Sequence, residues 1–152
     1  MRGQARRGSV LVEFVLAGIP ILLTVISVIE ISRCMWTYNT LAYAVKEGTR
    51  MAIVHGENNP GTVGAIAQRI ADSSQGLRSD QINVTGTMSC SPLSSCLGSG
   101  SAWPALPRGT NISLTATYPF ESPIGIFFPG SGSSSTLPPI TLRASSQQRI
   151  QF

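Results

Sequence analysis

Glu13 is the side chain whose chemistry most needs an explanation, because it lies near the start of a long apolar run. That run, residues 10–31, reads VLVEFVLAGIPILLTVISVIEI and is about as long as a helix must be to cross the hydrocarbon core of a bilayer. A carboxylate inside lipid costs roughly 2 to 3 kcal/mol on insertion scales, so such a residue usually has a partner. Glu13 therefore predicts a cationic partner in an assembly.

Cleavage of the chain between Gly8 and Ser9 would create such a partner. The new chain would begin SVLVE, with a free amine on its first residue and Glu13 as its fifth. At about 1.5 Å of rise per residue, these groups lie about one helical turn apart. In a bundle of such helices the amine of one subunit can meet the carboxylate of a shifted neighbour, and this pairing specifies register. The alternative is a carboxylate near the headgroups that stays solvated or protonated.

No constellation of residues typical of catalysis occurs elsewhere in the sequence. The single histidine, His55, has no nucleophile motif near it, the acids are scattered, and there is no phosphate-binding glycine loop. We expect neither an enzyme nor a bound cofactor.

The three cysteines predict a disulfide and no metal site. Cys90 and Cys96 lie in the loop SCSPLSSCLGSGS, where a small disulfide-closed loop is expected if this part of the chain faces an oxidising compartment. Two cysteines and the distant His55 do not supply the four ligands of a zinc site. Cys34, at the outer end of the apolar run, is interpreted as a small buried apolar residue.

Positive charge is concentrated at the N-terminus. The formal net charge is +4, yet Arg2, Arg6 and Arg7 precede the apolar run with no acid among them. Without these three, eight basic residues face seven acidic ones, a net charge of +1, so no basic patch for nucleic acid remains. By the positive-inside rule, the arginines place the N-terminus in the cytoplasm and the residues after Ile31 outside it.

The apolar run is interpreted as a membrane anchor and not as a secretory signal peptide. It continues through Val28 and Ile31 without a small-residue cleavage pattern. Lipid attachment at Cys34 is disfavoured because Arg33 stands where a small residue is expected.

The helix is expected to continue beyond the membrane to about His55, over about 70 Å in total. Apolar or small residues recur there at alternating steps of four and three, on one helix face, at Cys34, Tyr38, Leu41, Val45, Gly48 and Ala52. Glu47 and Arg50 lie off this face at a spacing that lets them interact. Pro20 predicts a kink, with a neutral membrane-helix proline as the alternative. Trp36 and Tyr38 fit either interfacial anchors or core packing.

The remaining residues predict a small α+β domain. Thr62 is placed to cap a second helix that carries Ile66 and Ile70 on one side and ends near Gly76. Three β-rich runs follow, at residues 81–88, 111–120 and 140–144, the last with an extension toward Phe152. Their apolar faces carry Ile82, Val84 and Met88 in the first run and Ile112, Leu114 and Tyr118 in the second. We expect an antiparallel sheet packed on both helices.

Long loops rich in serine, glycine and proline join the strands. Gly-Ser repeats in residues 98–101 and 130–135 are interpreted as flexible linkers. The apolar tract of residues 124–128, between Ile124 and Phe128, either docks on a partner subunit or the membrane surface, or folds under its loop to cap the core.

The first third of the chain resembles a known family. The run RRGSVLVEFVLAGIPILL and the segment of residues 29–56 are similar to TadE-like minor pseudopilins of the tight-adherence (Tad, or Flp) pilus, a type IV pilus system. The resemblance reappears faintly in the C-terminal strands. It implies that a prepilin peptidase cuts between Gly8 and Ser9, with Glu13 at the fifth mature position. It also implies other minor pilins, the major pilin and inner-membrane platform proteins as partners.

These observations predict a pilin-like α+β protein with four parts: a cleaved basic cytoplasmic leader at residues 1–8, a transmembrane helix at 9–32, its extramembrane continuation at 33–56 and a periplasmic domain at 57–152. The expected function is that of a minor pilin or pseudopilin in the assembly or initiation of a Tad pilus used in adhesion, located in the bacterial inner membrane. The alternative is a membrane-anchored periplasmic binding or scaffolding domain outside any filament. A DNA-binding pilin is disfavoured by the near-neutral outer domain.

Overall fold

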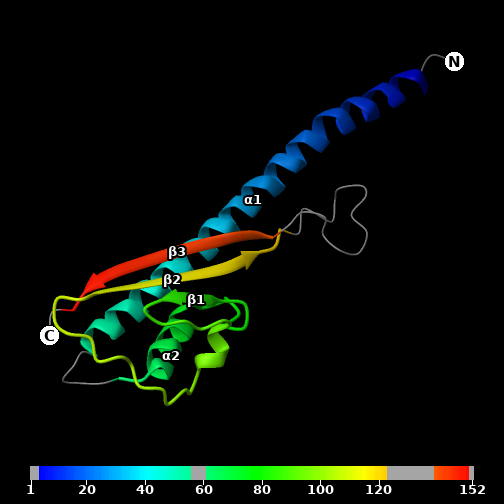
Figure 1. The fold of residues 1–152 in the computed structure, drawn as a ribbon. Coiled ribbons are helices and arrows are strands. Elements are labelled where there is room, and N and C mark those ends of the chain that lie inside the picture. The colour runs from blue at the N-terminus through cyan, green and yellow to red at the C-terminus, as the bar shows by residue number, and fades with distance from the viewer. Residues whose placement is uncertain (1–3, 56–60, 123–138, 151–152) are drawn as a thin grey trace. The chain divides into compact units, whose positions relative to one another are not determined.

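The computed structural model describes residues 4–55, 61–122 and 139–150, with side chains described from Val10 onward. Figure 1 shows a long helix, a short helix and a small antiparallel sheet, which confirms the predicted α+β class. The elements in chain order are α1 (Gln4–Val54), α2 (Val63–Ser73), β1 (Asn83–Gly86), the short 3-10 helix η1 (Leu93–Cys96), β2 (Asn111–Phe120) and β3 (Ile140–Arg149).

The chain divides into two compact units, and α1 contributes to both. The first unit contains Met1–Cys34 and Ser122–Thr136, and the second contains Met35–Glu121 and Leu137–Phe152. The first unit therefore holds the apolar part of α1, whereas the second holds the rest of α1, α2 and the sheet. The hydrophobic core lies in the second unit.

The second unit buries one face of α1, as the spacing of its apolar residues predicts. Leu41, Val45 and Ala52 are fully buried and Gly48 is buried with them. The prediction is wrong at Tyr38, which is exposed, because the buried face at that level of the helix carries Thr37 instead. Cys34 is only half-buried and belongs to the other unit.

Helix α2 begins and packs as expected. The Thr62 hydroxyl accepts a hydrogen bond from the Ala65 N–H at 3.2 Å, which caps the helix. Ile66 and Ile70 are fully buried, and Gly48 of α1 lies directly against the Ile70 side chain. The helix ends at Ser73, shortly before Gly76.

The three strands form one antiparallel sheet in the order β1-β2-β3. Ile112 and Leu114 are buried as predicted, and Tyr118 is partly buried against the same core. β3 includes the expected extension and pairs with all of β2, from Asn111 opposite Arg149 to Phe120 opposite Ile140.

Strand β1 is shorter than the predicted residues 81–88. It ends at Gly86, whose φ of +127° only glycine adopts readily, and the chain then turns so that Val84 also bridges Cys90. Ile82 and Met88 are nevertheless buried, so the predicted inward face is confirmed although the strand is not.

The loop before β2 is held by specific contacts, which overturns its interpretation as a flexible linker. The N–H of Val63 donates to the carbonyl of Ser101 at 2.9 Å, and that of Gly64 to Ser99 at 3.2 Å. Trp103 follows, with its side chain buried in the core and its backbone N–H donating to the carbonyl of Gly61 at 2.8 Å. The expected linker at residues 130–135 and the apolar tract Ile124 to Phe128 lie outside the described residues.

Candidate functional site

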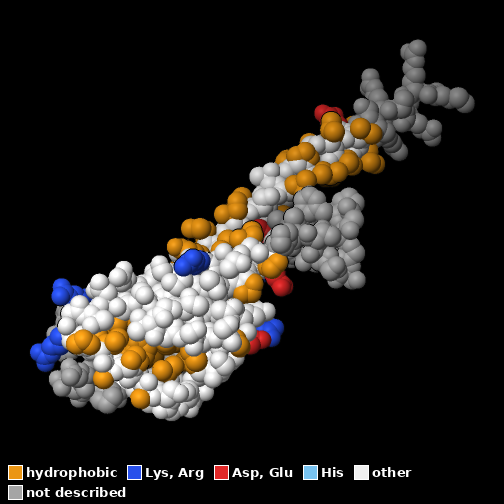
Figure 2. All heavy atoms as spheres, in the orientation of Figure 1, with side chains coloured by type: hydrophobic (Ala, Val, Ile, Leu, Met, Phe, Trp, Pro, Cys, Tyr) orange, Lys and Arg blue, Asp and Glu red, His pale blue; other side chains and the backbone are white. Residues whose placement is uncertain are grey.

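The first unit presents an apolar helix whose large side chains remain exposed. Phe14, Leu16 and Ile21 are among them, and Figure 2 shows apolar side chains along this part of α1. By length and composition α1 is long and apolar enough to cross a membrane. Exposed apolar surface of this extent favours a membrane or another helix as its environment.

Three hydroxyl groups described in the apolar part of α1 are bonded to the helix's own backbone. Thr24, Ser27 and Ser32 each donate to the carbonyl four residues earlier, on Pro20, Leu23 and Val28, at 2.8 Å in each case. A hydroxyl bonded in this way leaves no donor unsatisfied in a medium without water. These three hydroxyl residues are therefore compatible with lipid.

Glu13 lies within α1 and is exposed, on the same continuous helix as Gly8 and Ser9. Among the side chains that the structure describes, no cation lies within ion-pair distance of Glu13. Pro20 also lies inside α1, and the kink expected there stays a prediction.

A second acid, Glu30, lies at the C-terminal end of the apolar segment. Its carboxylate accepts from Arg33 at 3.0 Å and from the Ser122 hydroxyl, just after β2, at 3.2 Å. The Glu30–Arg33 spacing of three residues is visible in the sequence, whereas Ser122 is brought close only by the fold. The pair provides charge at the point where the apolar residues end.

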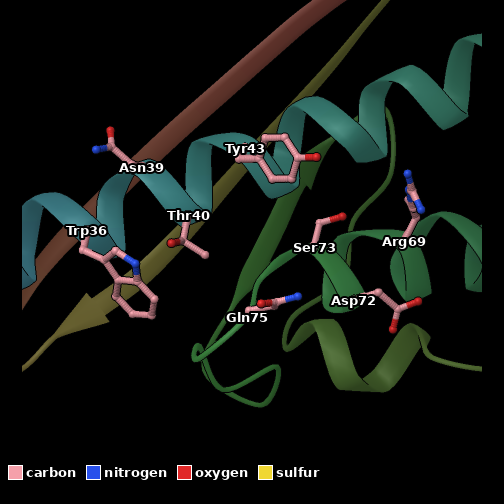
Figure 3. A pocket seen from close by; sticks show the side chains of 8 residues that line it. All are labelled: Trp36, Asn39, Thr40, Tyr43, Arg69, Asp72, Ser73 and Gln75. Atoms are coloured by element: carbon pink, nitrogen blue, oxygen red, sulfur yellow. The ribbon is translucent and has the colours of Figure 1, made fainter.

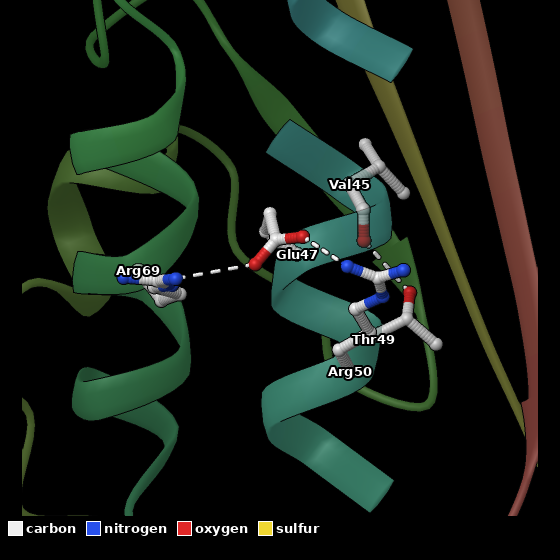
Figure 4. Close-up of polar contacts among 5 residues, drawn as sticks. All are labelled: Val45, Glu47, Thr49, Arg50 and Arg69. Atoms are coloured by element: carbon white, nitrogen blue, oxygen red, sulfur yellow. Dashed lines mark hydrogen bonds and ion pairs between the residues drawn. The ribbon is translucent and has the colours of Figure 1, made fainter. Parts of the chain in front are cut away.

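In the second unit, Glu47 joins α1 to α2. Its carboxylate accepts from Arg50 at 2.8 Å and from Arg69 of α2 at 3.2 Å, as Figure 4 shows. The residue is only 8% exposed. The hydrogen bond from Arg69 lowers the pKa of Glu47 below its ordinary value, with help from Arg50 and against the opposing effect of burial. The carboxylate is therefore held ionised between two helices.

Cys90 and Cys96 form the expected disulfide, with their Cα atoms 5.9 Å apart. Cys90 is buried, and its backbone N–H and carbonyl both pair with Val84 of β1 at 2.8 Å. The bond thus attaches η1 to the edge of the sheet. Over the described part of the chain, no three histidine, cysteine or acidic side chains gather as metal ligands would.

Comparison with known proteins supports the resemblance found at the N-terminus. Residues 8–50 match the family model described as TadE-like protein. The match confirms the resemblance over this segment and suggests a protein associated with the Tad pilus. No curated protein and no solved structure matches the chain.

Proposed function

We propose that this protein is a minor pseudopilin that acts in the assembly or initiation of a Tad pilus. Residues 1–8 are a cytoplasmic leader that a prepilin peptidase removes, residues 9–32 cross the inner membrane, residues 33–56 continue the helix outside it, and residues 57–152 form a periplasmic domain. Its partners are other minor pilins, the major pilin and the platform proteins of the machinery.

One observation carries the proposal: an exposed carboxylate on an apolar helix for which the described part of the chain supplies no cation. The cost of keeping an unpaired charge in lipid favours a partner from another molecule. Cleavage after Gly8 would put an amine on Ser9, four residues before Glu13, and would give every subunit one charge of each sign at this end of the apolar helix. The TadE-like match begins at residue 8, at the proposed cleavage site.

Mass spectrometry of the protein purified from membranes tests the processing step. In cells that contain the prepilin peptidase we expect a mature chain that begins at Ser9, and in cells without it a chain that retains residues 1–8. A chain that stays uncut although the peptidase is present overturns the proposal and leaves a tethered periplasmic domain.

Replacement of Glu13 tests the pairing itself. Glu13→Leu removes the charge, so we expect normal membrane insertion and cleavage but loss of copurification with other pilins and of pilus assembly. Glu13→Asp keeps the charge and is the matched control, for which we expect assembly to be retained at least in part. Unchanged assembly in Glu13→Leu contradicts the pairing.

A further inference from the structure

In the second unit, helix α1 carries a second stripe of residues, next to the face that is buried in the core. These residues recur at alternating steps of four and three, which places them on one side of the helix. They are Trp36, Thr40, Tyr43, Glu47, Arg50 and Val54. The side chains of Trp36 and Tyr43 are each 56% exposed and Val54 is 53% exposed, so the second unit leaves much of this stripe uncovered.

Two hollows follow this stripe along the seam between α1 and α2. The first, of about 570 Å³, is lined by Trp36, Thr40 and Tyr43 of α1 and by residues of α2 and its C-terminal end, as Figure 3 shows. The second, of about 410 Å³, is lined by Glu47, Arg50 and Val54 together with neighbouring residues. Arg69 of α2 lines both hollows. We call the two hollows together the α1–α2 groove.

The middle of the groove has an excess of positive charge. Arg50 and Arg69 each use one nitrogen on Glu47, and their side chains remain 56% and 53% exposed. A guanidinium group has five N–H donors, and in the part of the chain described here no other acceptor of these two is found. Two cations against one carboxylate leave a net charge of +1. The other acid of the groove, Asp72, lines only the first hollow and accepts from Gln68 at 2.8 Å.

A lipid surface does not explain the whole groove. Trp36 suits the boundary of a membrane, but Val54 lies eighteen residues further along α1, or about 27 Å at 1.5 Å per residue. The headgroup layer on one side of a bilayer is only about 5 to 8 Å thick. Single exposed apolar residues are ordinary, whereas apolar side chains at both ends of one helical stripe with cations between them match the pattern of a helix-binding groove.

We propose that the α1–α2 groove binds a helix of a partner protein that carries a carboxylate between apolar side chains. The carboxylate pairs with Arg50 and Arg69, in the hollow that contains Val54. Apolar residues of the partner helix cover Trp36 and Tyr43 on one side and Val54 on the other. This contact lies outside the apolar segment and requires neither cleavage at Gly8 nor the charge of Glu13, so it goes beyond the proposed function.

Photo-crosslinking in cells with the complete pilus machinery tests the groove. A photoreactive amino acid replaces Tyr43 or Val54 in the full chain, and the matched control replaces Ser145, an exposed residue of β3. We expect both groove positions to give an adduct with the same partner protein, mapped to one helical segment with an acidic residue, and Ser145 to give none. Adducts with lipid alone, with a second copy of this chain or with a segment that has no acid overturn the proposal, as does the absence of any protein adduct.

A charge exchange tests the ion pair. Arg50→Glu is expected to lower the adduct yield about tenfold, because two carboxylates then face each other, and changing the partner's acid to lysine is expected to restore it. If the partner's lysine does not restore the yield of the adduct in Arg50→Glu, the proposed ion pair between Arg50 and the partner's acid is contradicted. If Arg50→Glu does not fold, Tyr43→Ser in a chain with the photoreactive residue at Val54 removes apolar contact area instead, and an unchanged yield there contradicts the groove. The mature N-terminus, measured in the same samples, shows whether processing at Ser9 is intact independently of docking.

Discussion

Glu47 is a buried acid whose charge is stabilised by the residues around it. Leaving a carboxylate in a site that is 8% exposed is unfavourable unless hydrogen bonds replace water, and the two arginines supply them. Because one arginine comes from α1 and the other from α2, the carboxylate also fixes how the two helices pack. The charge of this single residue therefore contributes to the stability of the second unit.

The depressed pKa of Glu47 predicts a dependence of stability on pH. A carboxyl group whose pKa is lower in the folded state stabilises that state above its ordinary value of 4.5, and this contribution is lost as the pH falls through the folded pKa. We expect the Tm of the full chain in detergent to fall on acidification from about pH 6 to about pH 3, and to fall less in Glu47→Gln.

Asp80 provides the matched control for this measurement. Its pKa is also lowered by a hydrogen bond, from Arg78, but both side chains are largely exposed and solvent screens the pair. Asp80→Asn should leave the slope of Tm against pH close to that of the parent chain. Equal slopes in the parent and Glu47→Gln would show that the buried carboxylate is not the group responsible.

Local spacing explains which polar contacts can be predicted from the sequence. Glu47 and Arg50 are three residues apart on one helix, so their contact follows from helix geometry alone. Arg69 lies twenty-two residues from Glu47, and its contribution depends on how α2 packs on α1. The bond from Ser122 to Glu30 spans ninety-two residues and has no local signal at all.

The contact between α1 and α2 depends on the absence of a side chain at Gly48. A Cβ atom added at this position would lie against Ile70, with its Cδ1 atom only 2.7 Å away, and Ile70 is fully buried and has little room to move. This glycine therefore sets how closely the two helices approach.

Gly48→Val is expected to destabilise the full chain by about 1 to 3 kcal/mol, because the added atoms overpack the core. Chemical or thermal denaturation in detergent measures the change. Gly18→Val on the same helix is the control, since nothing lies within 4 Å of a Cβ atom there, and it should cost less. A similar loss at both positions would assign the effect to the backbone of the helix and not to packing.

The disulfide holds the η1 segment against β1. Its cysteines are six residues apart, and closing so short a loop stabilises the folded state by roughly 2 kcal/mol in the chain-entropy model. We expect the double variant Cys90→Ala with Cys96→Ala to lose about that amount of unfolding free energy, and the reduced parent chain to behave similarly. A free thiol count before and after reduction verifies the starting state, and an unchanged stability would show that the backbone pairing with Val84 suffices.

At the level of elements, periodic patterns predict that a helix or strand forms better than they predict where it ends. The second half of α1, α2 and the first two strands follow from apolar spacing, because burial on one face imposes that spacing. The early end of β1 follows from the conformation of Gly86 and from pairing with Cys90, which involve distant backbone groups. Trp103 enters the core from a loop that has no periodicity, so pattern reasoning misses it.

The two units of the chain face different physical demands. The first exposes apolar side chains along a single helix, whereas the second buries a core of its own. The apolar run followed by ordinary globular residues predicts an exposed apolar helix and a separate core, whereas the bounds of the two units have no signal in the sequence. The α1–α2 groove is harder to predict, because exposed side chains of α1 define it only together with Arg69 of α2.

The proposed topology places the second unit outside the cytoplasm. In a chain with Cys34→Ala and Ser145→Cys, a membrane-impermeant maleimide should label the new cysteine in spheroplasts as fully as in lysed cells, because Ser145 is exposed on β3 and the original pair Cys90–Cys96 is oxidised. A cytoplasmic protein with an exposed cysteine is the control and should react only after lysis. Labelling that requires lysis would place the unit on the inner side of the membrane.

Thr24, Ser27 and Ser32 donate their hydroxyl hydrogen bonds to the backbone of α1, which affects the environments that this part of the helix tolerates. Each hydroxyl already donates to a carbonyl of its own helix. None of the three therefore needs a new hydrogen-bond acceptor when protein side chains replace lipid acyl chains around the helix. In the proposed assembly, these three residues would therefore keep their hydrogen bonds when the helix moves from the bilayer into a filament, whereas Glu13 would exchange its surroundings for a partner on another subunit.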